Sequence, residues 1–83
     1  MTDFEADVFR ALVFVAPHTP DHGASAWQVA HVMDDGVYPA IAGGALARLL
    51  RKGFLEVVGE APNTSRRYGL TEQGRRWAVA MEA

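Results

Sequence analysis

Six arginines in the second half of the chain have the chemistry and the spacing to bind nucleic acid. Four of them lie within SRRYGLTEQGRR (Ser65–Arg76), and two more, Arg48 and Arg51, are separated by close to one helical turn. The planar guanidinium group matches guanine edges and phosphate oxygens with two parallel hydrogen bonds. The pattern therefore favours a nucleic-acid-binding surface, with a solvated charged surface as the alternative.

Charge is distributed unevenly along the chain, whose net charge is −2. Residues 1–41 hold six acidic residues and one basic residue, whereas residues 42–83 hold seven basic and four acidic residues. The two balances are −5 and +3, which together give the net charge. Net acidity argues against strong nonspecific binding to nucleic acid, but the asymmetry permits one basic face on an acidic body.

Residue types that support catalysis or metal binding are scarce. The chain has no cysteine, which excludes disulfides and thiolate metal sites and favours a reducing compartment. Neither serine lies in a nucleophile elbow. His18, Asp21 and His22 lie in one loop, but Pro17 and Pro20 break the helix that would align them, and no fourth ligand is evident. We therefore expect no enzyme activity, no metal and no cofactor.

Length and hydropathy indicate a single domain, residues 1–83, that does not enter a membrane. A chain of 83 residues has room for one small core. Its acidic start, MTDFEADVF, is unlike a secretory signal. No apolar run approaches the roughly 20 residues that span a bilayer. A cytoplasmic protein is expected.

Two capping boxes mark where the first two helices begin. Thr2 and Glu5 form one, and Ser25 and Gln28 form the other, before the short helix AWQVAHVM. The first box is followed at helical spacing by an apolar stripe that should enter the core, namely Phe4, Val8, Leu12 and Val15.

A third helix and a β-hairpin follow. The third helix is expected over Pro39–Lys52, because proline suits a first helical turn. FLEVVGE and RRYGLT then read as two strands around the turn APNTS. Leu55 opposite Leu70 and Val57 opposite Tyr68 would make the hairpin half-buried, with its tip at residues 61–64.

Thr71 is expected to cap a last helix, so the elements follow the order α-α-α-β-β-α, mostly α with a small β-hairpin wing. VYPAIAGGALARLLRKGFLEVV resembles the recognition helix of winged helix-turn-helix regulators, and SRRYGLTEQGRRWA resembles the end of their wing and the next helix. The chain is thus similar to the PadR and MarR-like groups of this DNA-binding family over about residues 25–78. The resemblance implies a third helix in the major groove and a wing over phosphates.

The DNA-contacting residues expected on this basis come from the second helix, the third helix and the wing. They are Ser25, Gln28, Gly44, Ala47, Arg48, Arg51, Asn63, Thr64, Arg66 and Arg67. On the third helix, Arg48 and Arg51 are the candidates for base edges, because its exposed face is otherwise bare. Arg67 has an alternative role in a cross-strand ion pair with Glu56 or Glu60.

A small transcriptional regulator that binds duplex DNA is the first functional hypothesis. The alternative is a winged-helix module that binds protein, as an adaptor or inhibitor, which net acidity and the bare third helix favour. A homodimer is also expected, through apolar residues on the two terminal helices, namely Phe9, Val13, Trp77 and Met81. These side chains could instead pack on one another within one chain.

Overall fold

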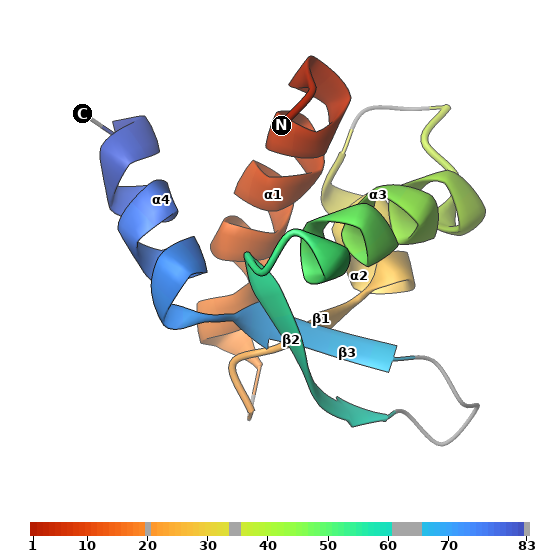
Figure 1. Ribbon diagram of the computed structural model, residues 1–83. Helices are drawn as coiled ribbons and strands as arrows, with labels where there is room; N and C mark the ends of the chain where they lie inside the picture. The colour runs from red at the N-terminus through yellow and green to blue at the C-terminus, as the bar shows by residue number, and fades with distance from the viewer. Residues whose placement is uncertain (20, 34–35, 61–65, 83) are drawn as a thin grey trace.

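The computed structural model describes residues 1–19, 21–33, 36–60 and 66–82, which form four α-helices and a small antiparallel sheet (Figure 1). None of the helices in these ranges is long and apolar enough to cross a membrane. The expected wing-tip residues Asn63 and Thr64 lie outside the described residues. The elements, in chain order, are α1 (Asp3–Val15), the 3-10 turn η1 (Ala16–His18), β1 (Ala24–Ser25), α2 (Ala26–Val32), α3 (Pro39–Arg51), β2 (Leu55–Glu60), β3 (Arg66–Leu70) and α4 (Glu72–Glu82).

Helix α1 begins at the predicted capping box and supplies much of the core. The Thr2 hydroxyl accepts a hydrogen bond from the Glu5 amide at 3.1 Å, and the Glu5 carboxylate accepts one from the Thr2 amide at 3.0 Å. Val8 and Leu12 are fully buried, as the apolar stripe predicts.

The structure corrects the predicted dimer surface at Phe9. It is fully buried in the core of its own chain. Phe54, which follows the turn after α3, meets it edge to face with ring centroids 6.2 Å apart. The interface assigned to Phe9 is therefore wrong, because a ring inside the core presents nothing to a second copy.

Helices α2 and α3 pack on α1. Their caps and bounds lie close to those predicted from the sequence. Both hydrogen bonds of the Ser25–Gln28 capping box are present. Helix α3 starts at Pro39 and ends at Arg51, one residue before the predicted end. Gly53 then adopts a φ of 87°, a left-handed conformation that turns the chain into β2. The buried face of α3 consists of Ala42, Ala45, Leu46 and Leu49.

The sheet has the predicted hairpin and one additional strand. Leu55 faces Leu70 and Val57 faces Tyr68, so the predicted register is confirmed. A bulge between Val57 and Gly59 then shifts the pairing. The two-residue strand β1 was not predicted, and it pairs antiparallel with β3 to give the order β1-β3-β2.

Helix α4 is attached through its first turn. The Thr71 hydroxyl accepts a hydrogen bond from the Gly74 amide at 3.0 Å, which confirms Thr71 as the cap, and donates one to the Gly53 carbonyl at 2.6 Å. Gly74 is the buried residue of α4, and Trp77 stacks obliquely on Phe54 with centroids 5.5 Å apart. Figure 1 shows the rest of α4 standing beside α1 at the edge of the molecule.

Candidate nucleic-acid interface

Two cations at the C-terminal end of α3, Arg48 and the capping residue Lys52, share one carboxylate of α1. The Arg48 Nε donates to the Glu5 Oε2 at 2.8 Å, and the Lys52 Nζ donates to the Glu5 Oε1 at 2.8 Å. Glu5 is only 1% exposed, whereas the side chains of Arg48 and Lys52 are each 45% exposed. The carboxylate is therefore fixed beneath the two cations, which still reach the surface.

Glu5 remains ionised well below neutral pH. The hydrogen bond from Lys52, then that from the Thr2 amide, then that from Arg48 lower the pKa of Glu5 from 4.5 to about 2. These donors outweigh the opposing effect of burial. Because one carboxylate faces two cations, the cluster of Glu5, Arg48 and Lys52 keeps a net positive charge at neutral pH.

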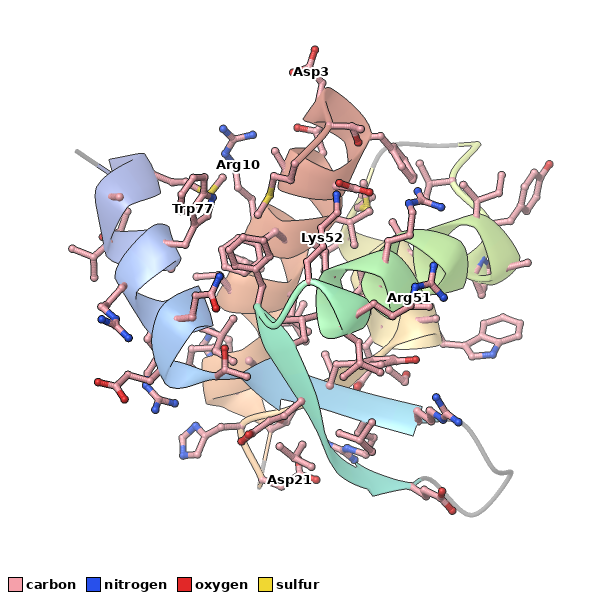
Figure 2. The ribbon with its side chains drawn as sticks, in the orientation of Figure 1. Asp3, Arg10, Asp21, Arg51, Lys52 and Trp77 are labelled. Carbon is pink, nitrogen blue, oxygen red and sulfur yellow. The ribbon has the colours of Figure 1, made fainter. Side chains whose placement is uncertain are left out.

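Arg51 adds a further positive charge at the same end of α3. It is exposed, and within the described residues its side chain makes no hydrogen bond or ion pair. Figure 2 shows Lys52 directed toward α1 and Arg51 directed away from it. Arg51 is therefore the α3 cation most accessible to a ligand outside the chain.

Arg67 is held by a different partner from the predicted one. Its Nη2 donates to the Asp21 Oδ1 at 2.7 Å and to the Gly23 carbonyl at 3.1 Å, and its side chain is 22% exposed. The bulge in β2 places Gly59 rather than a glutamate opposite Arg67, so the pair with Glu56 or Glu60 does not form. Arg66 occupies the exposed position at the start of β3 instead.

The remaining predicted contact residues divide into two groups. Ser25 is buried, and its hydroxyl oxygen and the Gln28 amide oxygen accept each other's backbone N–H, so Ser25 offers little to a phosphate, whereas half-buried Gln28 keeps its side-chain NH2 as a donor. Gly44 is exposed and Ala47 is half-buried on α3, so they offer backbone and methyl surface but no polar side chain.

Sequence reasoning missed the part that Glu5 plays in this surface and the exposure of Tyr38. Glu5 was predicted only as a capping residue, because nothing local shows that α3 crosses α1 at its first turn. Large apolar side chains near α3 are also exposed, with Tyr38 at 66%, Ile41 at 49% and Trp27 of α2 at 65%. The outward position of Trp27 follows from helical periodicity, which places it opposite the buried face of α2.

No protein-family model matches this chain, and no curated protein sequence matches it. What the protein does must therefore be inferred from the geometry and the charges described above.

Proposed function

We propose that this chain is a small winged helix-turn-helix protein that binds duplex DNA as a transcriptional regulator. Helix α3 would enter the major groove, and the β2–β3 hairpin would follow the phosphates. The observation that carries the proposal is the charge at the end of α3. Three cations, Arg48, Arg51 and Lys52, stand there against the single carboxylate of Glu5, a net charge of +2.

The connectivity of the sheet supports the winged-helix part of the proposal. Strand β1 directly precedes α2 and pairs with β3, so the sheet is tied to the start of the α2–α3 pair. Strand β2 directly follows α3, with only the Gly53 turn between them. Figure 1 shows the C-terminal end of β2 and the N-terminal end of β3 on the same side of the molecule as α3, away from α4.

In the proposed complex the affinity for DNA is low, and most of it comes from contacts between cations and phosphates. Arg51, exposed Arg66 and the one surplus charge of the Glu5 cluster together correspond to about three phosphates neutralised per copy. Arg67 contributes less than its position suggests, because Asp21 already pairs with it.

A salt series tests this proposal. Fluorescence anisotropy with a labelled duplex of mixed sequence should show affinity falling with salt, with a log–log slope of about −0.9 for each phosphate contacted. Arg51→Ala should make the slope shallower by about 1. Arg76→Ala removes the same charge from exposed α4 and should leave the slope unchanged. Absence of binding at low salt would reject DNA binding.

The exposed apolar side chains favour a second candidate function, a protein-binding module. Tyr38 and Ile41 lie at the start of α3, where a DNA-reading helix is expected to carry polar groups. If the salt series shows no binding, a partner that covers these residues becomes the better hypothesis.

A further inference from the structure

The guanidinium group of Arg48 is held by one edge. Its Nε bonds to Glu5, and its Nη1 lies over the bare backbone of Gly44, 3.7 Å from where a Cβ on that glycine would be. Within the described residues, neither Nη1 nor Nη2 of Arg48 donates a hydrogen bond. The two terminal amino groups are therefore available, while the inner edge is fixed.

The group that fixes this edge is itself immobile. The Thr2 amide and the Lys52 ammonium both bond to the Glu5 Oε1, and Arg48 takes the Oε2. A carboxylate that is 1% exposed and held from three directions has little freedom to rotate. Arg48 therefore loses side-chain freedom during folding rather than during binding, which lowers the entropic cost of an ordered contact.

We propose that Glu5 is a positioning residue that presents Arg48 for a two-hydrogen-bond contact with guanine in the major groove. The inference rests on the proposed DNA-binding function. Lys52 is the third component, because its charge compensates Glu5 and leaves the charge of Arg48 for the ligand.

A Glu5 whose only role is a structural salt bridge between α1 and α3 would give a different result. If Glu5 only joins α1 to α3, its loss should weaken binding to every duplex by a similar factor. If it positions Arg48, its loss should remove the preference for guanine. Binding to a duplex without guanine should not weaken, because a negative charge near the phosphates has been removed.

The experiment compares alternating dG-dC and alternating dA-dT duplexes, using the full chain. Wild type should prefer dG-dC by at least about fivefold, the effect of one good two-bond contact. Glu5→Gln keeps a residue suited to the capping box but removes the charge, and should lose the preference to the level of Arg48→Ala. Glu72→Gln, the matched charge control on exposed α4, should keep it.

The outcomes separate the inference from the proposed function. Wild type that binds neither duplex at low salt refutes DNA binding itself. Wild type that binds both duplexes equally, or Glu5→Gln that keeps the preference, overturns the positioning role alone.

A second measurement uses wild type only, in case Glu5→Gln does not fold. In nuclear magnetic resonance spectra, the Arg48 Nε–H signal should be distinct and protected from exchange in the free protein, unlike that of Arg51. The Arg48 Nη signals should become distinct on adding dG-dC but not dA-dT. An Arg48 Nε–H that is averaged in the free protein, or Nη signals that stay averaged with dG-dC, would overturn the inference.

Discussion

Replacing Gly74 with alanine should loosen the attachment of α4 to the rest of the fold. A Cβ at this position would overlap the carbonyl oxygen of Phe54 and lie 3.1 Å from its carbonyl carbon. Backbone atoms cannot rotate away as the end of a flexible side chain can. The first turn of α4 would have to shift, and with it the Thr71 hydroxyl bonds to Gly53 and Gly74.

The size of the effect follows from two opposing contributions. Forcing an extra methyl into a filled site costs about 1–3 kcal/mol. Alanine is favoured over glycine by up to about 1 kcal/mol within a helix, and by less in a first turn. The net loss is therefore about 1–2 kcal/mol, from a total of roughly 4–12 kcal/mol for a domain of this size. The Tm should fall by about 5–15 °C.

Gly44→Ala is the matched control and should raise the stability instead of lowering it. The new methyl would be 3.7 Å from the Arg48 Nη1, an ordinary contact, so only the gain in helix propensity of up to about 1 kcal/mol remains. Urea and thermal unfolding followed by circular dichroism give both values. In a Trp27→Phe background, fluorescence also reports the environment of Trp77 on α4.

The reasoning is refuted if Gly74→Ala and Gly44→Ala change the free energy of unfolding in the same direction. Gly74→Ala that is as stable as wild type would mean that α4 does not dock closely on the Phe54 backbone. Gly44→Ala that is more stable yet binds DNA less tightly would show that the bare surface of α3 matters for close approach of the duplex.

Three further predictions concern ion pairs and assembly. Hydrogen bonds from Lys52, Thr2 and Arg48 lower the pKa of Glu5 from 4.5 to about 2. The stability that these bonds confer is therefore complete above pH 4.5 and is lost as the pH falls toward 2. In acid unfolding curves, Glu5→Gln should lack this loss. Asp21→Ala should cost about 0.5–1 kcal/mol in urea unfolding, because the pair is partly exposed and Arg67 keeps its hydrogen bond to the Gly23 carbonyl, and an unchanged midpoint would contradict the pair. Sedimentation equilibrium should show a dimer that Met81→Glu weakens, whereas a single mass near 9.0 kDa at all concentrations would exclude it.

Features of the fold that depend on neighbouring residues could be predicted from the sequence. The capping boxes at Thr2 and Ser25 are set within a few residues, and the first half of the hairpin register is set within one hairpin. Strand β1 could not be predicted, because two residues carry no periodicity. The position of Phe9 could not be predicted either, since a second apolar stripe on a helix fits a core or an interface equally well.

The arginines of the candidate site could be predicted, but their partners could not. Arg48 and Glu5 are 43 residues apart in sequence, and Arg67 and Asp21 are 46 residues apart. Such pairs are set by how the helices cross and by where the bulge in β2 falls. No local pattern contains that information, so sequence reasoning overestimated how many arginines are available to a ligand.

The same pairs change what the charge asymmetry of the sequence means. Acidic residues of the first half, Glu5 and Asp21, neutralise cations of the second half across the fold. The basic face is therefore reduced to a few charges around Arg51 and Arg66. One copy with so few phosphate contacts should bind DNA weakly and lose affinity quickly as salt rises. A second copy bound to the first would bring its own phosphate contacts to the same duplex and make them intramolecular, which raises the affinity without any change in the charge of each copy. Regulation by so small a basic face would therefore require dimerisation.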